Sequence, residues 1–137
     1  MTDLQVLYDS FVKKTNEEWD DRVDLFVSYI YPSIAKIYKQ LRHSYTYTFD
    51  DSAQTGYFDE SLDIDEIELI ALQMSYDYIN DNKLSRLSSM QQMLGTKDFD
   101  KIPNLKNERD TVTEKLKILE DTIESLKNDM NDYYGHS

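Results

Sequence analysis

The sequence predicts an all-α protein, a helical bundle with a long C-terminal helix and one irregular loop rich in aromatic and acidic residues. The 137 residues include only three glycines and two prolines, so tight turns are scarce and long helices are favoured. Apolar residues recur at helical spacing through most of the chain, and the last third carries a regular heptad pattern. We expect a single helical domain over residues 1–137.

Two helices are expected before residue 44. The first lies within residues 1–14 and is amphipathic, so we expect a lid or a contact with a partner. Its apolar positions are Leu4, Leu7, Tyr8, Phe11 and Val12. The second spans residues 15–43 and begins at a capping box of Thr15 and Glu18. Pro32 predicts a kink or break at Tyr31, because proline disfavours helical geometry in the preceding residue. The apolar stripe of this helix contains Trp19, Val23, Phe26, Val27, Ile30, Ile34, Ile37, Tyr38 and Leu41.

Residues 44–62 lose the helical spacing and form the predicted acidic, aromatic loop. Tyr45, Tyr47 and Phe49 alternate with threonines, which is typical of a short extended segment. The sequence SAQTGYF then indicates an irregular loop around Gly56. A loop of this length in a small domain is more often functional than idle.

Residues 63–95 predict the central helices. Asp63 and Glu66 have the spacing of an N-terminal cap, and negative charge in the first turn is favoured by the helix dipole. Two apolar stripes follow, so this helix should be the buried centre of the fold. The stripes contain Ile67, Leu69, Ile70, Ala71, Leu72, Met74, Tyr76, Tyr78 and Ile79. The run Asn80-Asp81-Asn82 predicts a break or cap, and Gly95 predicts a left-handed C-terminal cap.

The long C-terminal helix is expected over residues 103–134, after a turn with the sequence TKDFDKIPN. Its heptad seam is apolar at eight of nine positions. These are Leu105, Arg109, Val112, Leu116, Leu119, Ile123, Leu126, Met130 and Tyr133. Such a seam packs against the chain's own helices or against a second copy, and a helix of this length can do both along its length.

The net charge of −12 is concentrated in one segment. No Lys or Arg occurs between Arg42 and Lys83, whereas ten carboxylates do. These are Asp50, Asp51, Asp59, Glu60, Asp63, Asp65, Glu66, Glu68, Asp77 and Asp81. The remaining residues carry 15 bases against 17 acids. This segment therefore excludes nucleic-acid binding through its own face.

Residues with catalytic or metal-binding chemistry are sparse. The chain has no cysteine, and its two histidines, His43 and His136, lack the spacing of metal ligands. The acidic runs lack the glycine and terminal glutamate of a calcium loop, and no nucleophile, phosphate-loop or dinucleotide motif occurs. We expect no enzyme, no cofactor and no metal. With neither a signal peptide nor a long apolar run, a soluble cytoplasmic protein without a membrane partner is expected.

Three segments resemble a known family. They are FDESLDIDEIELIALQMSYDYI, QMLGTKDF and NLKNERDTVTEKLKILEDTIESL, within a similarity that spans about residues 17–130. They are similar to small neck proteins of tailed bacteriophages, of the head-to-tail connector or adaptor family. The most specific parts are the pattern from Phe58 to Ala71 and the turn from Gly95 to Phe99. The chain departs from the family at Tyr78-Ile79-Asn80-Asp81, where tryptophan and basic or proline residues would be expected.

The resemblance implies a helical subunit of a homo-oligomeric ring, with twelve copies beneath the portal protein, in a virion assembled in the host cytoplasm. Neighbouring neck or tail proteins would contact it, and double-stranded DNA would pass through without specific binding. The expected channel or ring-contact acids are Asp50, Asp51, Asp59, Glu60, Asp63 and Asp65. The expected subunit-interface residues are Tyr45, Tyr47, Phe49, Tyr57, Leu116, Leu119, Ile123, Leu126, Met130 and Tyr133.

Three other functions remain open from the sequence. The acidic segment also fits a DNA mimic that occupies the nucleic-acid-binding surface of a host protein. The C-terminal heptads fit a coiled-coil scaffold or chaperone, although that reading leaves the central buried helix unexplained. An enzyme that uses Asp63 and Asp65 with a metal ion comes last.

Overall fold

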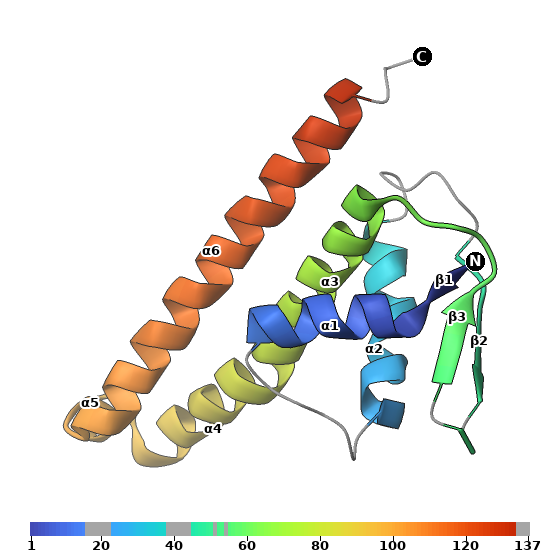
Figure 1. Cartoon of the computed structure of the whole chain (residues 1–137). Coiled ribbons are helices and arrows are strands. Elements are labelled where there is room, and N and C mark those ends of the chain that lie inside the picture. The colour runs from blue at the N-terminus through green and yellow to red at the C-terminus, as the bar shows by residue number, and fades with distance from the viewer. Residues whose placement is uncertain (16–22, 38–44, 51, 54, 134–137) are drawn as a thin grey trace.

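The structure, a computed structural model, describes residues 1–15, 23–37, 45–50, 52–53 and 55–133, apart from the side chains of residues 23, 24, 132 and 133. The described part is mostly helical, which confirms the predicted fold class (Figure 1). The helices are α1 (Leu4–Thr15), α2 (Val23–Ile37), α3 (Ile64–Ile79), the π-helical turn η2 (Asn80–Leu84), α4 (Ser85–Leu94), α5 (Thr96–Asp100) and α6 (Pro103–Tyr133). The strands are β1 (Thr2–Asp3), β2 (Tyr47–Asp50) and β3 (Thr55–Phe58).

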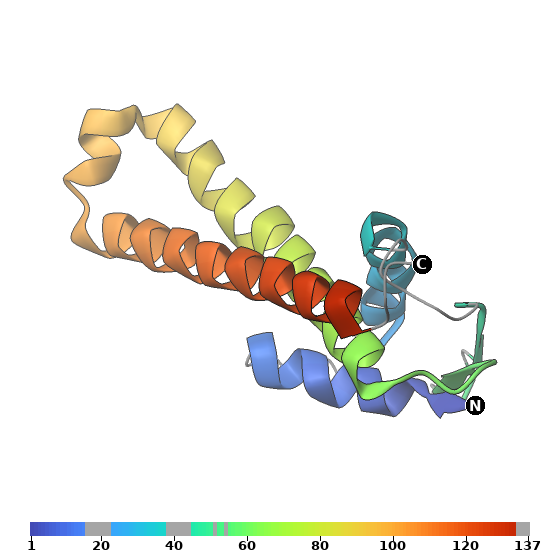
Figure 2. The ribbon, with the colours of Figure 1, turned by 90° about the horizontal axis from the view of Figure 1, so that it is seen from above.

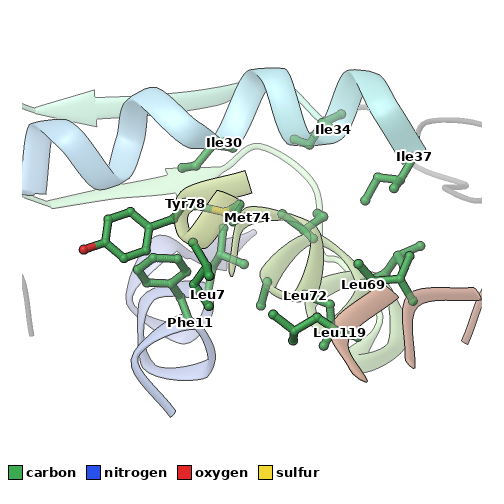
Figure 3. Packing of buried hydrophobic residues seen from close by; sticks show 14 of the residues in the cluster. Leu7, Phe11, Ile30, Ile34, Ile37, Leu69, Leu72, Met74, Tyr78 and Leu119 are labelled. Carbon is green, nitrogen blue, oxygen red and sulfur yellow. The ribbon is translucent and has the colours of Figure 1, made fainter. Parts of the chain in front are cut away.

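Helix α3 is the centre of the fold, as its two apolar stripes predict. It packs against α1, α2 and α6, so that buried residues occupy most of its circumference. Figure 3 shows Met74 and Leu72 of α3 surrounded by Ile34 of α2, Leu7 of α1 and Leu119 of α6. Burial on all sides removes the largest apolar area from water, which is the dominant favourable term in folding.

The predicted capping box at the start of α3 is present. The Asp63 amide donates to Glu66 Oε1 at 3.1 Å, and the Asp63 side chain accepts from the backbone of Glu66 in return. This pair satisfies amides that a helix start leaves without an intrahelical partner. It fixes the residue at which the acidic segment becomes helical.

Helix α1 is part of the core and not a lid. Leu4, Leu7 and Phe11 are buried, and the Phe11 ring packs at 6.0 Å from Tyr78 of α3 and 5.6 Å from Phe26 of α2. The helix also contacts β3. Its apolar face is therefore used within the chain.

The predicted start of the second helix at Thr15 is wrong. Thr15 ends α1, where its buried hydroxyl donates to the Phe11 carbonyl at 3.0 Å. Glu18 and Trp19 lie outside the described residues, as do Tyr38 and Leu41. Within the described part α2 runs from Val23 to Ile37.

Of the kink or break predicted at Tyr31, the break is wrong, because α2 continues through Pro32. Proline removes the amide that would bond to the carbonyl of Ser28. Ser28, Tyr31 and Pro32 are all exposed, so water can replace that bond. The opposite face of α2 buries Phe26, Ile30, Ile34 and Ile37.

Strands β2 and β3 form a β-hairpin. Strand β2 confirms the extended segment predicted from Tyr47 and Phe49, whereas β3 stands where an irregular loop around Gly56 was predicted. Strand β3 lies between β1 and β2 in an antiparallel sheet of order β1-β3-β2. Phe58 is opposite Thr2 on one side and Tyr47 on the other. The third strand comes from the N-terminus, far away in sequence, and local patterning does not reveal such a partner.

The predicted break at Asn80–Asn82 is a π-helical turn, so α3 continues through η2 into α4. The Asn82 side-chain amide donates to the Tyr78 carbonyl at 3.0 Å, and the Ser85 hydroxyl donates to the Asn80 carbonyl at 3.1 Å. These bonds satisfy carbonyls that the wider turn displaces. Asn and Ser side chains often compete with the backbone hydrogen bonds of a helix. In this turn their hydrogen bonds support the helix instead.

Gly95 has the positive φ of 83° that its position predicts, but its ψ of 147° lies outside the left-handed helical region. The chain therefore reverses into α5 where the sequence predicted only a turn. Phe99 of α5 is buried beneath the Arg109 guanidinium, whose carbon lies 5.3 Å from the ring centroid. Arg109 is the one polar residue of the heptad seam. Its cation–π contact with Phe99 connects α6 to α5 at this position.

Candidate functional site

The candidate functional site is the end of the molecule that carries the sheet and the acidic segment. The sheet is fixed to the helical core by Phe58, which is fully buried and packs edge-on to Tyr47 with 6.0 Å between ring centroids. Gly56 permits a close approach, because a Cβ atom there would lie 2.5 Å from the Thr48 carbonyl oxygen and 2.7 Å from Leu4 Cδ1. The hairpin is therefore a rigid platform.

A buried carboxylate connects the hairpin to α3. Glu66 is fully buried, and its Oε2 accepts a hydrogen bond from the Tyr45 hydroxyl while its Oε1 accepts from the Asp63 amide. A buried carboxylate requires such donors, because its desolvation is otherwise costly. Tyr45, predicted as a subunit contact, thus holds the hairpin in place.

The predicted acidic residues separate into two groups at opposite ends of β3. Asp50 lies at the turn end, where its Oδ1 accepts from the amides of Ser52 at 2.9 Å and Ala53 at 3.3 Å. Asp59 and Glu60 follow the other end, and Asp59 Oδ2 accepts from the Thr46 hydroxyl at 2.7 Å. Asp50, Asp59, Glu60 and Asp65 are exposed, whereas Asp63 is half-buried. Asp51 lies outside the described residues.

These carboxylates do not converge. Across the described part of the chain, no group of three or more His, Cys, Asp or Glu side chains could hold a metal ion. His43 and His136 lie outside that part. Glu68, at the next turn of α3, pairs with Lys14 Nζ at 2.8 Å and accepts from the Ser10 hydroxyl at 3.2 Å. The acids of α3 thus have capping and pairing roles, whereas those of the hairpin and its flank face solvent.

An aromatic cleft of about 680 Å³ lies between α2 and β2. It is lined by Tyr31, Ile34, Ala35, Tyr45, Thr46 and Tyr47. Tyr31 lies at the edge of this cleft and is 71% exposed. Burial raises the pKa of the Tyr47 hydroxyl above its usual 10.0, with a smaller contribution from nearby Tyr31. The cleft is therefore largely apolar, and the Tyr47 hydroxyl within it stays protonated at physiological pH.

A polar cluster that the sequence did not predict lies between α2 and α3. The buried carboxylate of Asp77 accepts from Ser33 Oγ at 3.0 Å, Gln73 Nε2 at 3.0 Å and Lys36 Nζ at 2.7 Å. A hollow of about 240 Å³ lies beside this cluster, and Asp77, Lys36 and Tyr29 are among the residues that line it. Burial raises the pKa of Tyr29, which a hydrogen bond from Asn82 partly offsets. An Asp on an apolar helix face, four residues after Gln73, is the only sequence signal for this cluster.

The predicted interface residues have different surroundings. Tyr57 is exposed, while Tyr47 and Phe49 are half-buried against the core. Leu116, Leu119, Ile123 and Met130 are buried and Leu126 is half-buried, in a helix that packs against α3. The heptad seam thus packs against the chain's own helices, the first of its two alternatives, and these residues are not open to a second copy. The side chain of Tyr133 is not described.

No helix in the described ranges is long and apolar enough to cross a membrane. Comparison of the chain with protein-family models, with characterised proteins and with solved structures finds no match.

Proposed function

We propose that this chain is a structural subunit of a tailed-bacteriophage neck, forming a ring that joins the portal to the tail and extends the DNA channel. Its partners are copies of itself, the portal protein and adjacent neck or tail proteins. It resides in the virion at the head–tail junction and catalyses no reaction. Double-stranded DNA passes through the ring without specific binding.

The rigid platform of exposed carboxylates supports this proposal most directly. Asp50 projects from the turn of a hairpin that Phe58 and the Tyr45–Glu66 hydrogen bond hold in place. No Lys or Arg follows Asp50 in the sequence until Lys83. Repeated around a ring, this platform would form a wall that repels phosphates within a Debye length of about 8–10 Å. DNA would then slide past the turn end of the hairpin without being retained.

The rigid core also suits a subunit that transmits mechanical load. Helix α3 is buried by three other helices, and α6 packs along it and η2. Densely packed interiors have low compressibility and transmit strain between their faces.

Assembly on the portal tests the proposal. The purified chain, mixed with the portal protein encoded in the same genome, should form a coaxial ring in negative-stain images. A chain that never binds the portal would contradict the proposed function.

Charge neutralisation tests the channel. Replacing Asp50, at the turn end of the hairpin, and its neighbour in sequence Asp51 by Asn should leave folding intact and impede DNA passage, measured as infectivity per assembled particle. The matched control neutralises Glu114 and Asp121, two exposed acids of α6, with the same change in net charge. Equal infectivity of the two variants would eliminate the channel assignment.

The same exposed acids favour a second candidate, a DNA mimic that inhibits a host nucleic-acid-binding protein. A mimic would compete with DNA for a basic partner and would remain small. A neck subunit would show no such competition and would assemble with its portal.

A further inference from the structure

The end of the molecule opposite the sheet is a helical arm, formed by α4, α5 and the first turn of α6, residues 85–106. Figures 1 and 2 both show α5 connecting the diverging ends of α4 and α6, far from the three strands. Few side chains of the arm are buried, Leu87 and Phe99 among them. Most of the arm surface is therefore open to solvent in the single chain.

The tip of this arm is apolar and basic. Met93 is 85% exposed, and Leu94 and Ile102 are 41% and 40% exposed. Lys97, Lys101 and Lys106 are exposed around them. From residue 85 to residue 106 the sequence has four Lys and Arg residues against two Asp residues, so the arm has a net positive charge although the whole chain is strongly negative.

The sheet end has the opposite charge and its own exposed apolar residues. Ile64 is 86% exposed and Tyr57 is 40% exposed. Asp3 of β1, Asp59 and Glu60 after β3, and Asp65 in the first turn of α3 are exposed. In the last part of α6, Ile118–Tyr133, five acids stand against Lys127 alone, so this part of α6 is also predominantly negative.

We propose that the tip of the arm, Met93, Leu94 and Ile102 with Lys97, Lys101 and Lys106, binds the sheet end of a second copy, at Tyr57, Ile64, Asp59, Glu60 and Asp65. The inference rests on the proposed ring and identifies which surfaces meet in it. Apolar side chains at the centre and complementary charges at the rim match the usual composition of protein interfaces. Asp50, at the other end of β3, stays available to the channel.

Contact between two different surfaces makes the interface head-to-tail. Two copies joined in this way keep one unused tip and one unused sheet end between them, so copies add until a ring closes. The heptad seam is not needed for this contact, because it is buried against α3. A dimer of arm against arm or sheet against sheet would place like charges together and is disfavoured.

Cysteine cross-linking tests the contact directly, since the chain has no cysteine. Met93→Cys and Ile64→Cys proteins, mixed at high concentration and low ionic strength and oxidised mildly, should form a disulfide dimer that neither forms alone. Ile118→Cys, at a 57% exposed residue in the middle of α6, replaces Met93→Cys in the control mixture. A yield no higher than this control would overturn the proposal, as would cross-linking of either variant alone.

Charge reversal provides a second test. The triple variant K97E/K101E/K106E should weaken self-association about tenfold or more in sedimentation velocity, as should the triple variant D59K/E60K/D65K. Association should return when the two variants are mixed, because each reversed surface then meets a complementary one. Loss without recovery on mixing would contradict the pairing.

The outcomes separate this inference from the proposed function. Rings on the portal without the Met93–Ile64 cross-link would refute the interface and leave the neck function standing. Tip-to-sheet association of a chain that does not bind the portal would support the interface and refute the neck function.

Discussion

At the scale of single residues, Asp77 shows how a charge is accommodated in the core. It is 5% exposed, and its two oxygens accept bonds from Ser33, Gln73 and Lys36. The Lys36 side chain is 55% exposed, so its ammonium remains partly hydrated while it neutralises the carboxylate. The cluster connects α2 to α3, because Ser33 and Lys36 of α2 both donate to the Asp77 carboxylate of α3.

Replacing Asp77 by Ala should lower the free energy of unfolding by roughly 2–4 kcal/mol, because it leaves buried donors on Ser33 and Gln73 without their acceptor. Urea unfolding followed by circular dichroism measures the change. Asp121→Ala removes an exposed Asp from α6 and should alter stability by less than about 0.5 kcal/mol. Equal effects of the two substitutions would mean that the Asp77 cluster contributes nothing.

Gly56 and Gly95 illustrate two different requirements for glycine. A Cβ atom at Gly56 would meet the Thr48 backbone oxygen at 2.5 Å, whereas at Gly95 nothing lies within 4 Å but φ is positive. Gly56→Ala should separate β2 from β3 and cost roughly 1–3 kcal/mol. Gly95→Ala should cost a similar energy through backbone strain without disturbing the sheet. Amide chemical shifts of β2 measure the difference; unchanged shifts in Gly56→Ala would contradict it.

At the scale of elements, α6 is defined by the contrast between its two faces. Leu119 is 7% exposed against the core, while its neighbour Ile118 is 57% exposed. Helical geometry places adjacent residues about 100° apart, so one residue of register decides which side chain is buried. The regular heptads keep the buried face on one side over the whole helix.

Leu119→Asp should unfold the chain or destabilise it by several kcal/mol, because an isolated carboxylate would enter the core. Ile118→Asp introduces the same group one residue earlier and should change the free energy of unfolding by no more than about 0.5 kcal/mol. Thermal melting of both variants measures this contrast. If Leu119→Asp stayed folded and only failed to self-associate, the seam would be an intermolecular interface after all.

At the scale of the whole molecule, the chain has a densely packed core and a less packed arm. Buried residues concentrate in α1, α2, α3 and the second half of α6, whereas α4 and α5 together bury only Leu87 and Phe99 among their described residues. Regions with few buried contacts open more often than the core that supports them.

The rate of amide hydrogen exchange should therefore differ between the arm and the core. Backbone amides of α4 and α5 should exchange at least about tenfold faster than those of α3, because they open without global unfolding. Exchange monitored by mass spectrometry gives both rates in one experiment. Equal protection in the two regions would show that arm and core unfold as one unit.

Several elements were predictable because their signals are local. The Asp63–Glu66 cap, the burial of α3 and the length of α6 each depend on spacings within one helix. Strand β3 was not predicted, because part of its pairing is with residues 2 and 3 at the N-terminus, far away in the sequence. The π turn was missed for a related reason: Asn82 supports the helix by bonding to Tyr78 and to Tyr29 of another helix.

The sequence by itself determined that the chain is helical, that the helix over residues 64–79 is largely buried and that most of the net negative charge comes from one segment. These properties follow from periodicity and composition, which fix the faces of an element without naming its neighbour. Only the tertiary structure decided that the heptad seam packs against α3, that the hairpin joins the N-terminus and that the basic arm tip lies opposite the acidic sheet. A stripe of leucines requires burial, and which surface provides it depends on how distant segments meet in space.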